Sequence, residues 1–410
     1  MNVLQLCPRV PFPPTDGGAI AMYDVAAGLV RAGHTVTLLA ANTPKHQQAA
    51  DALAHLGPGL RLVTVDVDTS LSPLKALRNL LFSPHPYNVE RFMSGALAAR
   101  LTELLTTEHF DVVQMEGTFV AWYVDVVQRV APGVPTVLRA HNVEHEIWDQ
   151  LARNERQGLK AGYLRHLARR LKRFEARYLP RFSAVAAITE PDQRRLRQLG
   201  CPEPVVFIPA GVDLTRVQPD AAIKAKPKTL FFLGSLDWRP NVEGLEWFLE
   251  HVWPEARKNH PELELQVAGK NMPAHIRALR VPGVRVHGFV ASAPVFMQEY
   301  EVMIVPLLSG GGMRVKIIEG MALGKCIIST GLGSEGIAVR HLHDILVCDD
   351  PQQWIEVLGQ YCHGEFCYKG VGEQAQRTAQ LLYDNDKVVQ RFVELYRRVG
   401  AGQAVALPPR

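Results

Sequence analysis

A glycine-rich turn followed by charged residues is the stretch of this chain whose residue types could do chemistry. Residues 306–325 read PLLSGGGMRVKIIEGMALGK. The glycines at 310–312 leave bare backbone amides where a helical pattern begins, and the N-terminus of a helix favours an anion. Arg314 and Lys316 add two cations within one turn of that helix start. These features predict a binding site for a diphosphate.

A carboxylate on the same predicted helix narrows the class of ligand that this site could bind. Glu319 lies one turn beyond the cations. It would repel a phosphate, but it can accept hydrogen bonds from hydroxyls such as those of a ribose. The combination therefore suits a nucleoside diphosphate. A glycine-rich loop with a solvated basic face is the alternative interpretation, because a glycine motif alone is a weak signal.

The composition fits a globular protein with two domains. The chain has 410 residues, of which 47% are hydrophobic and 21% are charged, and a net charge of +4. That charge is too small to predict a nucleic-acid partner. Six scattered cysteines without a CxxC pair suit reduced thiols, and Cys362, His363 and Cys367 lack the ligand spacing of a zinc site. No apolar run reaches the length of a membrane span. We therefore expect a cytoplasmic protein.

Strands alternating with helices predict an α/β fold made of two doubly wound, Rossmann-like domains with parallel sheets. The segment 209–228, rich in glycine and proline, is the predicted linker. We expect an N-terminal domain at 1–208, a nucleotide-binding domain at 209–384, and a C-terminal helix at 385–410 that crosses back to the first domain. The predicted strands are 3–7, 35–41, 61–67, 111–115, 136–140 and 184–188, then 229–233, 264–268, 284–287, 302–305, 326–330 and 344–347.

Several short segments, in order along the chain, carry a family resemblance. They are Gly17-Gly18, the HNVE at 141–144, the IPAGVD at 208–213, the FLGSLDWRPN at 232–241, the VAG at 267–269, the VHGFV at 286–290 and the stretch 305–336. Together they resemble the family 4 glycosyltransferases, retaining enzymes of the GT-B fold in which two domains face a central cleft. The Gly-Ser-Leu-Asp-Trp and Arg-x-Lys patterns are similar to one subset of that family.

The resemblance implies a role for each matching residue. Gly17 and Gly18 would let the backbone approach the donor diphosphate and the acceptor. His141 would be the active-site histidine near the anomeric carbon, with Glu144 and His145 beyond it. Arg314 and Lys316 would stabilise the leaving diphosphate. The other donor-binding residues implied are Gly234, Ser235, Arg239, Phe289 at the nucleobase, and Glu319 at the ribose.

The sequence departs from the family pattern at two places. Many members have a glutamate eight positions before the one matched by Glu319, and here that position is Gly311. Sugar recognition would then depend on backbone amides from Gly311 through Gly312 to Met313. In the loop after the strand at 229–233, Ser235 and Asn241 stand where the family has an arginine and a lysine. We expect Arg314 and Lys316 to supply the missing positive charge.

The resulting hypothesis is a retaining glycosyltransferase of the hexosyltransferase type. It would move a sugar from a nucleotide-diphosphate sugar to a glycan, a lipid-linked acceptor or a small molecule, in polysaccharide biosynthesis and without a metal. Asp66 and Asp68 match the Asp-x-Asp of metal-dependent transferases, but they end a strand far from the glycine-rich turn in sequence. Two alternatives stay open: a nucleotide-sugar epimerase of related fold, and a nucleotide-sugar-binding protein without turnover.

One basic segment carries more net positive charge than the chain as a whole. Residues 153–181 contain ten Lys or Arg against Glu155 and Glu175. Leu164, Leu167, Leu171, Phe174 and Tyr178 recur at helical spacing and predict one apolar stripe. The helix either packs that stripe on the first domain with a solvated basic face, or holds the basic face against an anionic membrane or a lipid-diphosphate acceptor.

Overall fold

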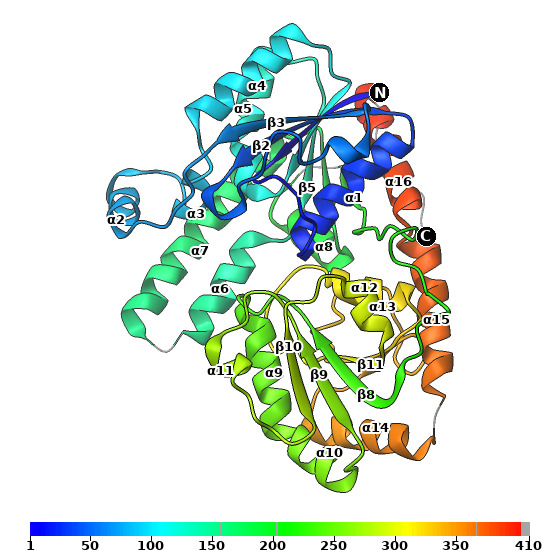
Figure 1. Cartoon of the computed structure of the whole chain (residues 1–410). Coiled ribbons are helices and arrows are strands. Elements are labelled where there is room, and N and C mark those ends of the chain that lie inside the picture. Colours follow the sequence, from blue (N-terminus) through cyan, green and yellow to red (C-terminus); the bar gives the residue numbers. More distant parts are fainter. Residues whose placement is uncertain (156, 202–203, 366, 403–410) are drawn as a thin grey trace. The chain divides into compact units, whose positions relative to one another are not determined.

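The computed structural model describes residues 1–155, 157–201, 204–365 and 367–402. The chain divides into two compact units, each with its own parallel sheet (Figure 1). The first unit comprises Met1–Gly211 and the segment from Asn385 onward, and the second comprises Val212–Asp384. Among the described residues, none of the helices has both the length and the apolar character needed to cross a membrane.

The first unit is built on a seven-stranded parallel sheet of order β3-β2-β1-β4-β5-β6-β7. Its central strands are almost continuously apolar because helices cover both faces of the sheet. The strands are β1 (Asn2–Cys7), β2 (Thr35–Asn42), β3 (Leu60–Asp66), β4 (Val112–Glu116), β5 (Thr136–Ala140), β6 (Ala184–Ala187) and β7 (Val205–Phe207).

The helices of the first unit include one from the far end of the sequence. Helix α16 (Asn385–Gly400) buries Val388, Val389 and Phe392 in the core beside α1. Asn385 Nδ2 donates to the carbonyl of Asp24 at 2.6 Å. The other helices are α1 (Gly17–Arg31), α2 (Pro73–Phe82), α3 (Tyr87–Glu90), α4 (Gly95–Thr107), α5 (Val124–Val130), α6 (Glu144–Asn154), α7 (Gly158–Tyr178) and α8 (Glu190–Gln198).

The second unit repeats the plan with a six-stranded parallel sheet of order β10-β9-β8-β11-β12-β13. The strands are β8 (Lys226–Leu233), β9 (Glu264–Ala268), β10 (Val284–Gly288), β11 (Tyr300–Val305), β12 (Cys326–Ser329) and β13 (Leu346–Val347). The helices are α9 (Arg239–His251), α10 (Trp253–Asn259), α11 (Ala274–Arg277), α12 (Ala293–Gln298), α13 (Val315–Ala322), α14 (Pro351–His363) and α15 (Tyr368–Leu382).

The predicted fold of two doubly wound α/β domains is confirmed, with one strand missed. Strand β7 pairs only Val205–Phe207 with β6, too short a run to stand out in the sequence. In each sheet the strand order reverses beside the first strand, between β1 and β4 and between β8 and β11. Ligands of such sheets bind beyond the carboxyl ends of the strands at this switch point. A ligand-binding site is therefore expected in the loops after these four strands.

Candidate active site

In the first unit, a buried carboxylate and a histidine meet at the carboxyl ends of β4 and β5. Glu116 ends β4, and its Oε2 lies 2.7 Å from Nε2 of His141, which follows β5. Glu116 is fully buried, whereas His141 keeps part of its side chain exposed. The sheet register makes this pairing possible, because Glu116 lies opposite Arg139, two residues before His141.

The surroundings of Glu116 keep its carboxylate charged. Its Oε1 accepts hydrogen bonds from the side-chain amides of Gln5 at 2.7 Å and Gln114 at 2.5 Å. Burial raises the pKa of Glu116, but the hydrogen bond from His141 and the charge of the buried Arg139 outweigh burial, so that its pKa lies below the usual value. An ionised carboxylate only accepts hydrogen bonds, so Nε2 of His141 is the donor. In the neutral ring this leaves Nδ1 as the acceptor nitrogen.

His141 was predicted from the sequence as a site residue, whereas Glu116 was not. The feature of the sequence that points to Glu116 is a charged residue at the end of the apolar strand VVQME. It lies two positions after a glutamine that is also buried. A buried charge needs a partner, and that partner comes from a neighbouring strand.

A second histidine–glutamate pair braces the helix that follows His141. Glu175 on α7 is fully buried and accepts hydrogen bonds from the backbone amides of Glu144 and His145 at 2.9 and 3.2 Å. Nδ1 of His145 lies 2.6 Å from the same carboxylate. Glu175 therefore caps the N-terminus of α6 from another helix. Burial raises the pKa of Glu144 to about 7, helped by the nearby Glu175.

The loop after β1 opens α1 as a helix N-terminus. Gly17 and Gly18 form the first turn of α1, and Oδ1 of the N-cap residue Asp16 accepts from the amide of Ala19 at 3.1 Å. Arg9 pairs with the same carboxylate. A side chain at Gly18 would make ordinary contact with Arg9, so packing alone does not require glycine there.

In the second unit, the loops after β8 and β11 meet through Lys316. Its Nζ donates to the carbonyl of Leu233 at 3.1 Å and to Oδ1 of Asn241 at 2.9 Å. A side-chain carbon at Gly234 would lie 2.8 Å from Asn241 and 3.2 Å from this Nζ. Gly234 therefore lets the backbone after β8 pass directly over the ammonium group. Burial, together with the charge of the nearby Arg314, lowers the pKa of Lys316 to about 7.

Lys316 lies beside one of the positions at which the sequence departs from the family pattern. Asn241 stands where the resemblance expects a lysine, and its side chain holds the ammonium of Lys316 on α13. A positive charge thus lies under the loop after β8, although it comes from a different element.

The glycine-rich loop after β11 is shaped around Arg314 and Trp238. Gly310 has φ of +105° and Gly312 has φ of +78°, conformations that favour glycine. A side-chain carbon at Gly310 would lie 2.7 Å from the Trp238 ring. The guanidinium of the buried Arg314 donates to the carbonyls of Gly311 and Gly312 and lies 5.3 Å from the centroid of the Trp238 ring. Arg314 therefore holds the loop as well as supplying charge.

The remaining predicted donor-binding residues lie on other loops and helices of the second unit. Glu319 is buried on the second turn of α13, while Gly311 and Met313 lie in the half-buried loop before it. Ser235 donates to Asp237 at 2.5 Å. The exposed Arg239 pairs with Glu243 across one turn of α9. Phe289 follows β10 with an exposed side chain.

The Asp66–Asp68 motif is divided between two structural roles. Asp66 ends β3 and accepts from Asn42 Nδ2 at 2.9 Å. Asp68 pairs with Lys75 at 2.9 Å and accepts from the amide of Ser70. Each carboxylate serves its local segment of the first unit.

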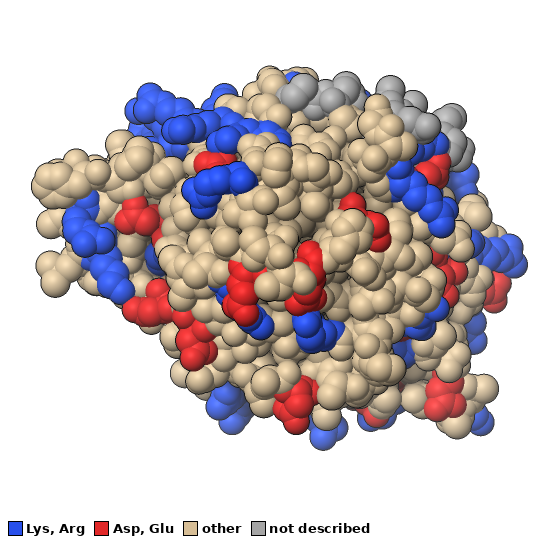
Figure 2. Space-filling view, turned by 90° about the horizontal axis from the view of Figure 1, so that it is seen from above, with Lys and Arg blue, Asp and Glu red and all other residues tan. Residues whose placement is uncertain are grey.

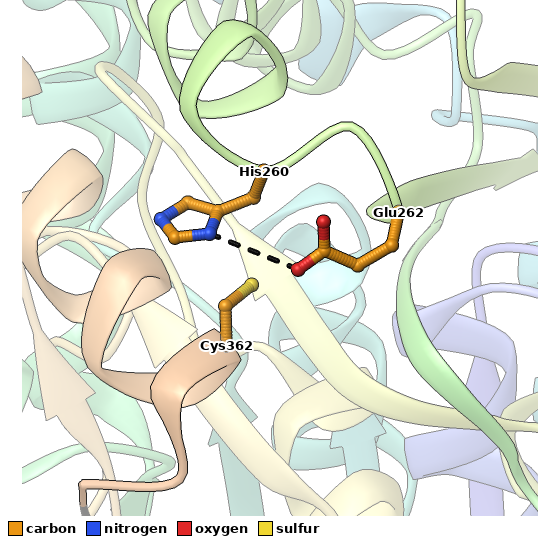
Figure 3. A group of neighbouring side chains, drawn as sticks. All are labelled: His260, Glu262 and Cys362. Atoms are coloured by element: carbon orange, nitrogen blue, oxygen red, sulfur yellow. Dashed lines mark ion pairs between the residues drawn. The ribbon is translucent and has the colours of Figure 1, made fainter.

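Among the residues that the structure describes, one group gathers ligand types for a metal ion. His260 and Glu262, before β9, and Cys362, near the end of α14, turn toward one another (Figure 3). Nδ1 of His260 and Oε1 of Glu262 are 3.8 Å apart. Burial raises the pKa of the Cys362 thiol to about 11, and Lys228 donates to the Cys362 carbonyl. These three candidate ligands, with the ammonium group of Lys228 nearby, do not make the closed four-ligand set of a structural zinc site.

The basic segment contains the last two residues of α6 and the whole of α7, with Arg156 outside the described residues. The predicted apolar stripe is buried at Leu167, Leu171, Phe174 and Tyr178, while Leu164 is only half-buried. Arg165, Arg169, Lys172, Arg173 and Arg177 are exposed. Arg170 is different, because it donates to Oδ1 of Asn79 at 3.0 Å and to the carbonyl of His85 at 2.7 Å. Arg170 therefore holds the segment after α2.

Comparison with known families finds a match in each half of the chain. Residues 15–216 match the model described as Glycosyltransferase Family 4, and residues 227–363 match the model described as Glycosyl transferases group 1. A curated relative, "Uncharacterized 44.6 kDa protein in cps region" of Klebsiella pneumoniae, is 25% identical over 168 residues. That match spans 39% of this chain and 43% of the relative.

Solved structures share the fold over nearly the whole chain. Sucrose-phosphate synthase from Thermosynechococcus elongatus has a TM-score of 0.73 at 17% identity, covering 98% of this chain and 100% of that one. Anabaena HepE in complex with UDP-glucose has a TM-score of 0.65 at 14% identity, covering 97% and 99%. The pneumococcal O-GlcNAc transferase GtfA, in complex with UDP and GlcNAc, has a TM-score of 0.66 at 12% identity, covering 97% and 99%.

Proposed function

Because the chain belongs to the family 4 glycosyltransferases, we propose that it moves a sugar from a nucleotide-diphosphate donor to an acceptor hydroxyl with retention of the anomeric configuration. The bond between the anomeric carbon and the diphosphate breaks, and a bond to the acceptor oxygen forms. The products are the glycoside, a nucleoside diphosphate and the proton of the acceptor hydroxyl.

The observation that carries the proposal is the position of Lys316 and Arg314 at the switch point of the second sheet. Lys316 lies 3.1 Å from the carbonyl that ends β8, and Arg314 closes the glycine-rich loop after β11. Negative charge grows on the diphosphate as the glycosidic bond breaks. Cations placed there stabilise the transition state more than the ground state, and thus accelerate the reaction.

The other predicted residues receive roles within the same proposal. His141, oriented by Glu116, acts near the donor sugar. Glu319 binds the ribose, and Phe289 lies at the nucleobase. Gly17 and Gly18 admit the donor diphosphate and the acceptor. Since Gly311 has no side chain, the amides from Gly311 to Met313 contact the sugar in place of a carboxylate.

A donor screen tests the function. The HepE structure contains UDP-glucose and the GtfA structure contains UDP and GlcNAc, so UDP-sugars are the first donors to supply. Release of nucleoside diphosphate that depends on an added glycan, lipid-linked or small-molecule acceptor is the expected result. A free epimer formed without acceptor would indicate an epimerase, and donor binding without turnover would indicate a binding protein.

Stereochemistry and metal dependence test the mechanism. We expect the NMR spectrum of the product to show the donor's anomeric configuration. We also expect EDTA to leave the rate unchanged, because Arg314 and Lys316 do the charge neutralisation that a divalent ion does elsewhere. An inverted product would reject the retaining mechanism, and loss of activity with EDTA would reject the metal-free one.

We further propose a cytoplasmic role in polysaccharide biosynthesis with peripheral attachment to an anionic membrane through α7. The relative described as lying in a cps region supports the pathway. The exposed cations of α7 support the attachment, since each basic residue near an anionic surface contributes about 1 kcal/mol. Arg169→Gln, Lys172→Gln and Arg173→Gln together should weaken binding to anionic liposomes. Arg170 is left unchanged because it has a structural role.

A further inference from the structure

Helix α2 in the first unit presents large apolar side chains to solvent. Leu74, Leu81 and Phe82 are 81%, 63% and 80% exposed. Leu71, Leu77 and Leu80 are also exposed. Asn79 is the only residue of this helix that is fully buried. A ten-residue helix with this much exposed apolar surface is not explained by packing within its own unit.

The helix is held in place by polar contacts at its inner side. Nδ2 of Asn79 donates to the carbonyl of His85 at 2.9 Å and to Glu90 Oε2 at 2.8 Å. Arg170 of α7 donates to Oδ1 of the same asparagine and to the carbonyls of Ser83 and His85. These bonds fix the inner side of α2 and leave its leucines directed away from the unit. The apolar surface is therefore a fixed feature of the fold.

The charge around α2 indicates what covers it. From residue 69 to residue 89 the chain has Lys75 and Arg78 but no aspartate or glutamate. Lys75 pairs with Asp68, so Arg78 carries the net charge of this segment. Arg173 and Arg177 are exposed and lie three and seven residues after Arg170, on the side of α7 that faces the α2 segment. In Figure 2, Lys and Arg side chains gather on the left side of this face, with uncharged surface between them.

We propose that α2 inserts its leucines and Phe82 into the headgroup region of an anionic bilayer, with Arg78, Arg173 and Arg177 contacting the lipid phosphates. An amphipathic helix with apolar residues on one side and cations beside them binds a membrane interface in this way. Apolar side chains spread around the exposed side of a helix suit a fluid partner better than a shaped protein groove. The inference extends the proposed attachment through α7 and does not depend on sugar transfer.

Vesicle flotation of the full-length protein tests the proposal. The vesicles are phosphatidylcholine alone and phosphatidylcholine mixed with phosphatidylglycerol. The variant Leu74→Gln/Leu81→Gln/Phe82→Gln changes only exposed side chains and should fold. Its binding to the anionic vesicles should fall about tenfold or more, because apolar burial in the interface is lost. Arg78→Gln/Arg173→Gln should weaken the binding and reduce its salt dependence.

The matched control is Leu342→Gln/Leu381→Gln in the second unit, where the two leucines are 68% and 65% exposed. This control should float like the wild type. Thermal unfolding and nucleoside diphosphate release with a water-soluble acceptor should be unchanged in all three variants, which separates this inference from the proposed chemistry. Wild-type flotation of the α2 variant would overturn the proposal. A wild-type dimer that becomes a monomer only in the α2 variant, measured by light scattering, would show that a second copy covers α2 and would also overturn it.

Discussion

Nε2 of His141 donates a hydrogen bond to Oε2 of Glu116 at 2.7 Å, across two adjacent strands of the first sheet. The carboxylate is fixed in turn by the side-chain amides of Gln5 and Gln114. The histidine ring is therefore held by a buried anion that is itself held by side chains of two strands, β1 and β4. An arrangement of this kind orients a functional imidazole before substrate arrives.

Glu116→Gln tests this orientation. We expect kcat to fall roughly 10- to 100-fold with KM little changed, because a neutral amide replaces a charge-assisted hydrogen bond. Steady-state kinetics check the split between the two constants. The matched control is Glu103→Gln, which removes an exposed carboxylate paired with Arg100 and should leave kcat unchanged. A wild-type kcat in Glu116→Gln would show that the pair only stabilises the fold.

The pKa of Lys316 predicts a pH dependence of donor binding. Lys316 titrates at about 7 in the folded protein, so it is charged at pH 6 and mostly neutral at pH 8. We expect nucleoside diphosphate to bind more weakly as pH rises through this range, by calorimetry. In Lys316→Met, the decrease of nucleotide affinity with pH should lose the contribution of this lysine. The decrease that remains measures titration of the ligand itself. If nucleotide affinity depended on pH equally in both proteins, Lys316 would not contact the diphosphate.

The same pKa predicts a trend in stability with the opposite sign. The usual lysine pKa is 10.5, so between about 7 and 10.5 the unfolded chain holds a proton that the folded protein has released. The free energy of unfolding should therefore rise with pH in this window, relative to Lys316→Met. Urea unfolding at pH 7 and pH 9 measures the difference between the two proteins. A difference that does not change between pH 7 and pH 9 would show that Lys316 keeps its charge when folded.

Arg314→Ala should lower kcat/KM by about 10- to 100-fold, because a charge-assisted contact to a phosphate contributes about 1.5–3 kcal/mol. Arg314 also holds the carbonyls of Gly311 and Gly312, so stability should fall as well. The matched control is Arg277→Ala, an exposed arginine of the same unit. Retention of wild-type kcat/KM in Arg314→Ala would contradict the diphosphate role.

The fold was predictable because its strands are apolar runs bounded by turn residues. Strands β5 and β9 were predicted with the bounds that the structure has. The site was predictable only in part. Glu116 looks like any polar end of a strand until the sheet order places β4 beside β5. The reach of Lys316 to Leu233 joins residues 83 positions apart, and no local pattern records such a contact. Candidate residues within one segment were visible in the sequence, whereas contacts between residues of different strands required the tertiary structure.

The same limit applies to α2. The spacing of its leucines is that of an ordinary amphipathic helix, whose apolar side is normally buried. The structure leaves them exposed because only Asn79 turns inward, toward Arg170 and Glu90. That reversal could not be deduced from the spacing of apolar residues.

Gly310→Ala tests the coupling between the glycine-rich loop and the cation. A methyl group at this position would be strained at φ of +105° and would meet the Trp238 ring at 2.7 Å. Trp238 would have to move, and it is the ring against which the Arg314 guanidinium lies. We expect a loss of about 1–3 kcal/mol in stability and weaker nucleotide binding. The control is Gly95→Ala at the start of α4, where the added carbon meets nothing within 4 Å. Urea unfolding and nucleotide titration measure both quantities, and equal values in the two variants would show that Trp238 and Arg314 are not coupled through Gly310.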